Sequence, residues 1–334
     1  MAKEKIFVTG ATGCLGASLI RRLVENGNDV HALIYPGTNH PYLDDLNITR
    51  FDGDILNIDS IRKAMKGCSS VYHVAGIVSY LKKDFQRMVK VHVEGTRIVL
   101  SVAIELGVRR VVHTSSCAAI GLPTSPDAAQ DENTKWDPKF DKIGYMYSKR
   151  LAEEECRKAC EKGLDVVMVN PTSFWGQGDI NMNEGEIIKK ISNGKVRITP
   201  PGGNSVVSVD DTVNGHLLAM TKGKMGERYI LSNEFLPFIE LMNIIAKELG
   251  VDKITKVLPK ASFSFLFCLA YVVELVSTTF NMGVKLTPAV INFSFNYRYY
   301  KSDKARKELG WKPKDSFRKA IKKAIEFYRE NELL

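Results

Sequence analysis

The 334-residue chain has no internal repeat and no low-complexity stretch, and its 25 Gly and 12 Pro follow no period. These absences exclude the collagen-like, low-complexity and disordered classes of protein. Hydrophobic residues make up 44% of the chain and charged residues 25%, which is typical of a packed globular protein. At about 100–200 residues per domain, the length allows one large domain or two coupled ones.

Cysteine is scarce, with six residues scattered along the chain, and no apolar signal segment precedes the first strand-like run. Both features predict a protein of the reducing cytoplasm. The one close pair, Cys156 and Cys160, has no histidine or second cysteine pair nearby to complete a zinc set. We therefore expect no metal site.

Basic residues exceed acidic ones, 47 to 38, which gives a net charge of +9. That balance suits an anionic small ligand, nucleic acid or an anionic membrane surface equally well. The positive charge is spread along the chain, and local runs such as residues 318–323 are typical of the solvated face of a helix. Nucleic acid is therefore not an expected partner.

The first half of the chain alternates between strand-like and helix-like patterns. Residues 6–8 form a short apolar run, residues 15–24 have helical spacing, and residues 30–34 are apolar again. Further strand-like runs lie at 70–74, 110–113 and 166–169, and helix-like segments at 58–66, 89–106 and 149–162. This alternation predicts an α/β fold with a doubly wound parallel sheet.

The alternation loosens after Pro171. Residues 176–203 are rich in Gly, Pro and Asn, and a charged helix is expected over 303–330. These features predict a smaller, helix-rich lobe. The apolar segments 206–221 and 228–231 are expected to return to the first sheet.

Residues 261–280 are apolar enough to be mistaken for a membrane span. The uncharged stretch between Lys260 and Glu274 is shorter than the roughly 20 apolar residues that a span needs. We therefore expect no transmembrane span. The primary interpretation is a buried helix over an apolar pocket, and the alternative is a helix that contacts a bilayer at its interface.

Three glycines, Gly10, Gly13 and Gly16, stand between the first strand-like run and the first helix. In such a turn one glycine allows a sharp bend, one lets the backbone approach a pyrophosphate, and one lets helix and strand pack closely. The helix N-terminus then points at the anion. The agreement of strand, turn and helix predicts a dinucleotide site rather than a merely tight turn.

The end of the second strand-like run carries neither of the residues that would decide between NAD and NADP. An acid there would bind the ribose 2′-hydroxyl and a basic residue the 2′-phosphate, but Tyr35 follows the strand. Because the acid that repels NADP is missing, NADP(H) is the preferred expectation and NAD(H) the alternative. Further on, Asp54 is expected either to accept from the adenine amino group or to cap a turn.

Tyr145 and Lys149 are four residues apart at the start of a helix, and so lie on one face of it. A nearby ammonium is expected to lower the pKa of the phenol from about 10 and make it an acid or base for a carbonyl oxygen. Ser115 and Ser116 end a strand-like run at the carboxyl edge of the sheet, where open α/β folds bind ligands.

Five segments together resemble the extended short-chain dehydrogenase/reductase superfamily: TGATGCLG at 9–16, GD at 53–54, YHVAG at 72–76, TSSCAAIG at 114–121 and YMYSK at 145–149. The resemblance continues through VNPTSFWGQGD at 169–179, VDDTVNGHLLAM at 209–220 and KARKELGWKPK at 304–314. Within this superfamily the chain most resembles the dihydroflavonol-reductase-like branch and its hopanoid-associated epimerase-like relatives. It also resembles the hydroxysteroid dehydrogenases.

The resemblance implies a catalytic set of Ser116, Tyr145 and Lys149, with Ser115 as the alternative serine. It implies that the cofactor is bound by Gly10, Thr12, Gly13, Cys14, Leu15, Gly16, Tyr35, Asp54, Ile55, Ala75, Gly76, Tyr145, Lys149, Pro171, Thr172 and Ser173. The substrate is expected against Ile77, Ser79, Phe174 and Trp175.

The same resemblance implies a Rossmann-like dinucleotide-binding domain over residues 1–170, to which 206–233 return. Residues 171–205 and 234–334 are expected to form the substrate-binding lobe. Relatives often dimerise through the helices that correspond to 89–106 and 149–162, which implies a homodimer.

Two departures from the family pattern concern chemistry. His92 stands where many members have Asn, and we interpret it first as a packing substitute and second as a change in a proton or water path. The arginine motifs with which nucleotide-sugar enzymes clamp a diphosphate are missing, since the corresponding segments read NSVVSVDD at 204–211 and NYRYYK at 296–301.

The leading hypothesis is an NAD(P)-dependent oxidoreductase that acts on a ketone or secondary alcohol of a bulky apolar substrate. It is favoured by the intact catalytic set and by the aromatic second lobe, with Phe174, Trp175, Phe263, Phe265, Phe267 and Tyr271. The first alternative is a nucleotide-sugar epimerase or dehydratase with transient hydride transfer. The second is a dinucleotide-binding sensor without catalysis.

Overall fold

The computed structural model describes residues 4–38, 40–123, 128–279 and 286–334. Seven parallel strands form its main sheet in the order β10-β6-β5-β4-β1-β2-β3. Their bounds are β1 Lys5–Thr9, β2 Asp29–Ile34, β3 Thr49–Asp52, β4 Ser70–His73, β5 Arg110–Thr114, β6 Val166–Pro171 and β10 Arg228–Leu231. The predicted doubly wound sheet is confirmed, and its order reverses between β1 and β4, where such sheets bind ligands.

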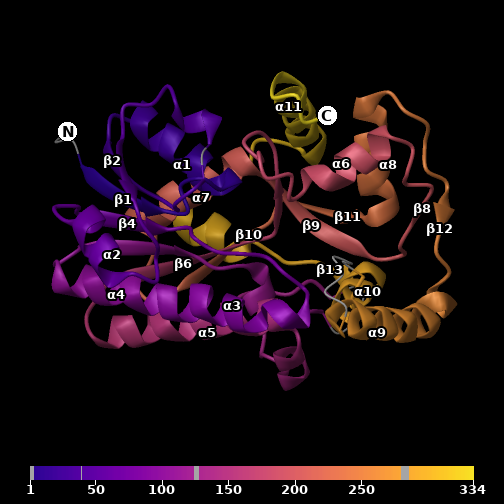
Figure 1. Ribbon diagram of the computed structural model, residues 1–334, viewed down its shortest axis with the longest axis horizontal. Helices are drawn as coiled ribbons and strands as arrows, with labels where there is room; N and C mark the ends of the chain where they lie inside the picture. The colour runs from indigo at the N-terminus through magenta and orange to yellow at the C-terminus, as the bar shows by residue number, and fades with distance from the viewer. Residues whose placement is uncertain (1–3, 39, 124–127, 280–285) are drawn as a thin grey trace.

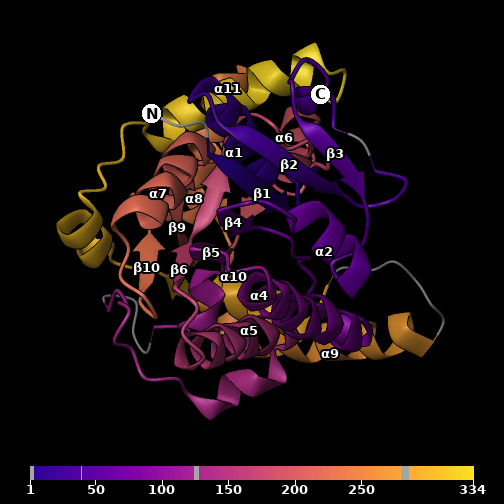
Figure 2. The same cartoon turned by 90° about the vertical axis from the view of Figure 1, so that its left-hand side faces the viewer.

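Helices cover both faces of the main sheet (Figures 1 and 2). Because side chains alternate along a strand, Ile6 and Val8 face α1 (Cys14–Glu25) and α7 (Val209–Lys222), whereas Phe7 faces the opposite layer. That layer consists of α2 (Ile58–Met65), α4 (Gly95–Glu105) and α5 (Gly144–Glu161). The short helix α3 (Phe85–Val89) packs beside α5.

The second lobe is built on a smaller sheet in which β9 (Gly203–Ser208) pairs with three other strands. These are β7 (Ser173–Trp175), β11 (Glu234–Pro237) and β13 (Tyr297–Arg298). Its core is closed by α6 (Gly185–Ser192), α8 (Phe238–Leu249) and α11 (Phe317–Glu330). A separate two-stranded pair joins β8 (Ile198–Thr199) to β12 (Lys256–Val257) at the outer edge (Figure 1).

Three expected segments differ from the structure. Residues 228–231 join the main sheet as expected, but residues 206–208 belong to the second sheet. Helix α7 begins directly after them, and the Ser208 side chain caps its N-terminus. The expected helix 303–330 is interrupted by Gly310, whose φ of +68° favours glycine. The segment 89–106 runs from α3 through a π-helical turn at Lys90–Glu94 into α4.

The expectation of a buried helix at 261–280 is wrong for the described part of that segment, and Phe280 lies outside the described residues. Helix α9 (Phe263–Thr279) lies along the outside of the second lobe, next to α10 (Pro288–Phe295) (Figures 1 and 2). Most of its large apolar side chains are exposed to solvent. The helix has too few neighbours to be covered on more than one side.

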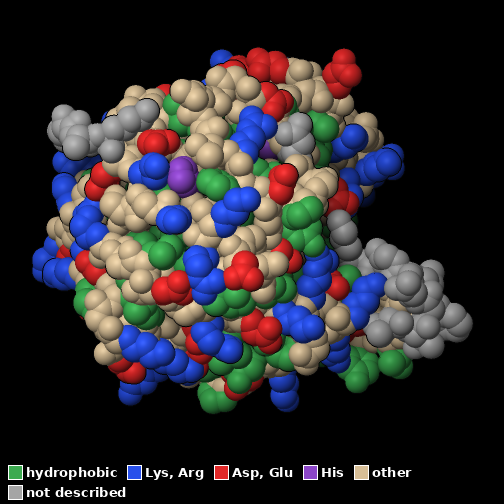
Figure 3. Space-filling model, turned by 60° about the vertical axis from the view of Figure 1, so that its left-hand side comes forward, with side chains coloured by type: hydrophobic (Ala, Val, Ile, Leu, Met, Phe, Trp, Pro, Cys, Tyr) green, Lys and Arg blue, Asp and Glu red, His purple; other side chains and the backbone are tan. Residues whose placement is uncertain are grey.

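Charges of both signs are interspersed over the face of the molecule shown in Figure 3. Lysine and arginine side chains lie between acidic ones across this face, without a continuous basic stripe. Such a distribution gives no electrostatic footprint for nucleic acid on this face.

The segment 311–315, which leads into α11, is bound by the buried carboxylate and the carbonyl of Asp211. Its Oδ1 accepts from the Lys314 backbone N–H (2.8 Å) and its Oδ2 from that of Asp315 (3.0 Å). The indole N–H of Trp311, which is fully buried, donates to the Asp211 carbonyl (2.9 Å). One residue therefore holds the segment that leads into α11.

We expect Asp211→Ala to lower the free energy of unfolding by about 3 kcal/mol, because two N–H groups lose their acceptor. The neighbouring Asp210→Ala removes only a partly exposed ion pair to Lys323 and should cost about 1 kcal/mol or less. Urea unfolding of both variants measures the difference. Equal losses would show that Asp211 is not the anchor.

Candidate active site

The glycine turn after β1 is sterically closed to side chains. Gly10 has φ +72°, and a Cβ there would lie 2.6 Å from the backbone nitrogen of Ala75. A Cβ on Gly16 would lie 2.0 Å from the carbonyl oxygen of Gly10. The turn therefore brings backbone against backbone at the point where the strand order reverses, as a pyrophosphate cradle requires.

A chain of hydrogen bonds holds β1 and β4 together at this point. The Thr9 hydroxyl contacts His73 Nδ1 (2.7 Å) and accepts from the Ala75 N–H (3.2 Å). His73 Nε2 in turn contacts the hydroxyl of Thr96 on α4 (3.0 Å). Burial lowers the pKa of His73 to about 3, so the imidazole is neutral.

Helix α1 points its N-terminus into the turn. Gly13 caps it without a side-chain hydrogen bond, and its first turn carries no acidic residue. The amide groups there are available for an anion. Leu15 packs into the core and the Cys14 thiol donates to the Gln177 carbonyl (3.6 Å), so these two residues offer backbone groups only. Burial raises the pKa of Cys14 well above its usual value.

The adenosine side of the cradle has an aromatic residue where an acid would stand. The Tyr35 side chain follows β2 and is 57% exposed. Thr38 donates to the Tyr35 carbonyl (2.7 Å) and contacts the hydroxyl of Thr12 (3.2 Å). Asp54 Oδ1 accepts from the Leu56 N–H (3.0 Å), which is the turn-capping contact expected as one of its two roles.

The two serines after β5 have different surroundings. Ser115 is buried and donates to the carboxylate of Glu153 (2.7 Å), which also accepts from Asn170 (2.7 Å) and faces Arg228 (3.3 Å). Ser116 is partly exposed, and its hydroxyl accepts from the Ala118 N–H (3.2 Å). A hydrogen bond with the Ser116 side chain lowers the pKa of Tyr145 against the larger effect of burial, which links Ser116 to this phenol. Sequence reasoning missed Glu153 because nothing in its local pattern marks a buried carboxylate.

The structure brings Ser116, Tyr145 and Lys149 to one place, but the expected electrostatic link between Tyr145 and Lys149 is wrong for the free protein. Burial raises the pKa of Tyr145 above its usual value, and only the hydrogen bond with Ser116 lowers it. Burial also lowers the pKa of Lys149 to about 8, opposed by the charge of Glu153. The Lys149 ammonium donates to the Thr114 carbonyl (3.0 Å).

His92 connects the loop after β4 to α5. Its Nε2 accepts from the Ile77 N–H (3.1 Å), so Nδ1 carries the proton and donates to the Ser148 hydroxyl (2.9 Å). Ser148 donates onward to the Tyr145 carbonyl (3.0 Å). His92 therefore does more than fill space, since it holds Ile77 at a fixed position relative to Tyr145.

A chain of aromatic rings leads from the buried Tyr145 to one arginine. Tyr80 packs edge-on against Tyr145 (ring centroids 5.8 Å apart) and against Phe293 of α10 (5.0 Å). The guanidinium of Arg298 lies over Phe293, 5.0 Å from the ring centroid. The positive charge of Arg298 lowers the pKa of the Cys117 thiol, but burial of the thiol has the larger effect and raises this pKa to about 11. Sequence reasoning did not assign Arg298 to the site, because residues 296–301 lack the arginine motif of nucleotide-sugar enzymes.

The remaining predicted residues divide between the site and other roles. Gly76 borders the site, since a Cβ there would lie 3.3 Å from Lys149 Nζ. Thr172 donates to the Leu231 carbonyl (3.2 Å) and Ser173 to Glu184 (3.0 Å). The predicted residues that contribute to packing or turns instead are Ile55, Ser79, Phe174 and Trp175.

Trp175 in particular lies in the core of the second lobe, with its ring edge-on against Phe317 (5.5 Å). Within the residues that the structure describes, no group of three or more His, Cys, Asp or Glu side chains could hold a metal ion.

The fold and these residues define a dinucleotide-dependent enzyme. The NAD dependent epimerase/dehydratase family model matches residues 6–232. The chain belongs to this family. It is an oxidoreductase of the extended short-chain dehydrogenase/reductase type, as its reductase, epimerase and dehydratase relatives are.

Three curated relatives cover between 73% and 98% of this chain. Sterol demethylase protein B of Methylococcus capsulatus is 32% identical and covers 98% of this chain and 99% of its own. A putative dihydroflavonol 4-reductase of Synechocystis is 32% identical, with 97% and 94% covered. Cinnamoyl-CoA reductase 1 of Petunia hybrida is 31% identical over 73% of this chain and 77% of its own.

Solved structures share the fold. The crystal structure of gox2253 superposes with a TM-score of 0.86 at 32% identity and covers 99% of this chain and all of its own. UDP-glucuronic acid 4-epimerase from Bacillus cereus in complex with NAD has a TM-score of 0.77 at 19% identity, with 98% and 96% covered. The second likeness shows the fold alone.

The pKa of Lys149 predicts a pH dependence of stability. The folded protein releases this proton near pH 8 and the unfolded chain near about 10.4, so the unfolded state binds more protons in between and stability rises with pH. Between pH 8 and 10 the wild type should gain about 2 kcal/mol relative to Lys149→Met. Urea titrations at several pH values measure this. The exposed Lys162→Met should follow the wild type, and parallel profiles for Lys149→Met would refute the assignment.

Proposed function

We propose that the enzyme transfers hydride between NADP(H) and a ketone or secondary alcohol of a bulky apolar substrate. The observation that carries this proposal is the hydrogen bond between Ser116 and Tyr145, one helical turn from Lys149, with Tyr80 packed against Tyr145 and Phe293 packed against Tyr80. Full-length likeness to a protein named as a dihydroflavonol reductase supports a carbonyl substrate. A hydroxysteroid-dehydrogenase-like substrate fits the same aromatic wall.

The cofactor fits the cradle that the structure forms. The backbone of Gly10, Gly13 and Gly16 would hold the pyrophosphate, where no side chain can intrude. Lys149 would bind the nicotinamide ribose, and the end of β6 at Pro171 would lie near the carboxamide. When bound, the nicotinamide supplies or accepts the hydride.

The protein's own residues manage the proton and the charge on oxygen. In reduction, Tyr145 donates its phenolic proton to the carbonyl oxygen, and Ser116 donates a hydrogen bond that stabilises the growing negative charge. Because burial favours the neutral phenol, Tyr145 starts this step protonated. A positively charged Lys149 stabilises the phenolate that remains.

Tyr145→Phe should reduce kcat by about 100-fold or more, because the proton donor is lost. The first measurement is fluorescence titration with NADPH and NADH, followed by loss of reduced-nicotinamide absorbance with a panel of apolar ketones. Tyr147→Phe is the matched control, because Tyr147 lies two residues along the same helix and stacks on Phe85. Retained turnover in Tyr145→Phe would overturn the mechanism, and tight cofactor binding without turnover of any ketone would overturn the reductase assignment.

The residue after β2 is expected to influence the choice of cofactor. Tyr35→Asp introduces a carboxylate that repels a 2′-phosphate and binds a ribose hydroxyl, so NADPH affinity should fall by about tenfold or more while NADH affinity rises. Tyr35→Asn, similar in size to aspartate and uncharged, should keep the wild-type preference. Tighter binding of NADH by the wild type would contradict the NADP(H) proposal.

A further inference from the structure

Helix α9 presents an apolar face to the surroundings. Seven of its large apolar side chains are between 36% and 71% exposed: Phe265, Phe267, Leu269, Tyr271, Val272, Leu275 and Val276. By length and composition, residues 260–277 could also cross a membrane. Single exposed apolar side chains are normal on a protein surface. Seven on one helix indicate a surface that contacts a membrane or another protein.

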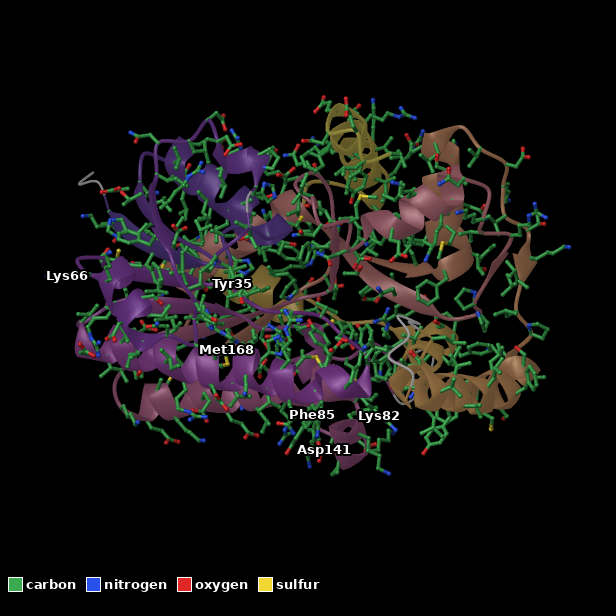
Figure 4. The ribbon with its side chains drawn as sticks, in the orientation of Figure 1. Tyr35, Lys66, Lys82, Phe85, Asp141 and Met168 are labelled. Carbon is green, nitrogen blue, oxygen red and sulfur yellow. The ribbon has the colours of Figure 1, made fainter. Side chains whose placement is uncertain are left out.

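The polarity of α9 is the reverse of that of an ordinary surface helix. Its one charged residue, Glu274, is turned toward the protein, where it accepts from the Lys82 N–H (3.2 Å) and pairs with the Lys82 ammonium (4.0 Å). Ala270 and Ser277 lie on the same covered side. The ion pair therefore removes the helix's only charge from its outward face. Figure 4 shows Lys82 beside the end of α9.

Lysines surround this apolar face. Lys253, Lys256 and Lys260 are exposed on the segment that leads into α9, against one exposed acid, Asp252. Further along the helix, the Lys82 side chain is 65% exposed and its ammonium lies 5.0 Å from the Tyr271 ring centroid. Lysine and tyrosine side chains of this kind place an apolar stem in a bilayer interface and a polar tip among the headgroups.

The arrangement favours a lipid surface over a second protein. Protein interfaces have a polar rim and about one hydrogen bond per 100–200 Å², but the outward face of α9 is mostly apolar, with Ser264 and the Tyr271 hydroxyl as its exposed polar groups and lysines nearby. Nearby lysines suit anionic headgroups. Because α9 packs along its length beside α10, the helix lies flat on the lobe instead of projecting from it.

We propose that α9 and the lysines beside it form a membrane-docking surface, with which the enzyme rests on an anionic bilayer. The apolar face enters the acyl boundary, and Lys82, Lys256 and Lys260 contact the headgroups. This inference does not depend on the reaction, since it rests on the outward face of α9 alone.

Vesicle flotation of the full chain tests the docking surface. The wild type should float with phosphatidylcholine vesicles that contain phosphatidylglycerol, and less well at high salt. Phe265→Glu and Leu275→Glu, at side chains that are 71% and 62% exposed, should reduce binding by at least about tenfold. Ile104→Glu, at a 39% exposed apolar residue on α4, is the matched control and should bind as the wild type does.

Unchanged melting temperatures and NADPH binding of the variants show that they are folded. Lys256→Glu with Lys260→Glu should weaken binding to anionic vesicles and reduce its salt dependence. Failure of the wild type to float, or equal flotation of all variants, would overturn the proposal. A wild-type dimer in light scattering that Phe265→Glu converts to monomer, without vesicle binding, would overturn it in favour of a second copy on this face.

Discussion

The active site depends on how closely the backbone after β1 approaches the backbone after β4. The distance is so short that Gly10 can carry no side chain, and Thr9 and His73 hold it through hydrogen bonds between buried groups. A buried polar group without a partner is costly, so this contact has one stable arrangement. From there the parallel register places the ends of β4 and β5 next to each other, so that Lys149 Nζ lies near Gly76 and donates to the Thr114 carbonyl.

The parts of the fold that follow from local pattern could be predicted. Alternation of strand and helix indicated the doubly wound sheet, and the glycine spacing marked the turn at residues 10–16. The i,i+4 spacing of Tyr145 and Lys149 placed them on one helix face, where the structure has them. These signals span a few residues each, so tertiary packing has little opportunity to override them.

The remaining features depend on contacts between segments far apart in the sequence. Glu153 is unremarkable on a charged helix, yet it meets Asn170 and Arg228 inside the protein. Burial raises the pKa of Tyr145 instead of lowering it as expected, because the desolvation of the phenol exceeds the effect of its hydrogen bond with Ser116. The exposure of α9 was missed for a related reason. Hydropathy measures how apolar a segment is, whereas its burial depends on how many neighbours the rest of the chain supplies.

The loop between Gly76 and Lys82 is fastened at two ends to two different parts of the molecule. His92 holds it to the catalytic helix through Ile77, and Glu274 holds it to α9 through Lys82. Tyr80, between these ends, touches Tyr145. A displacement of α9 is therefore expected to move Tyr80 relative to Tyr145. If the two are energetically coupled, the coupling must be reciprocal, so that a molecule held against Tyr80 would alter how firmly the enzyme holds to whatever covers α9.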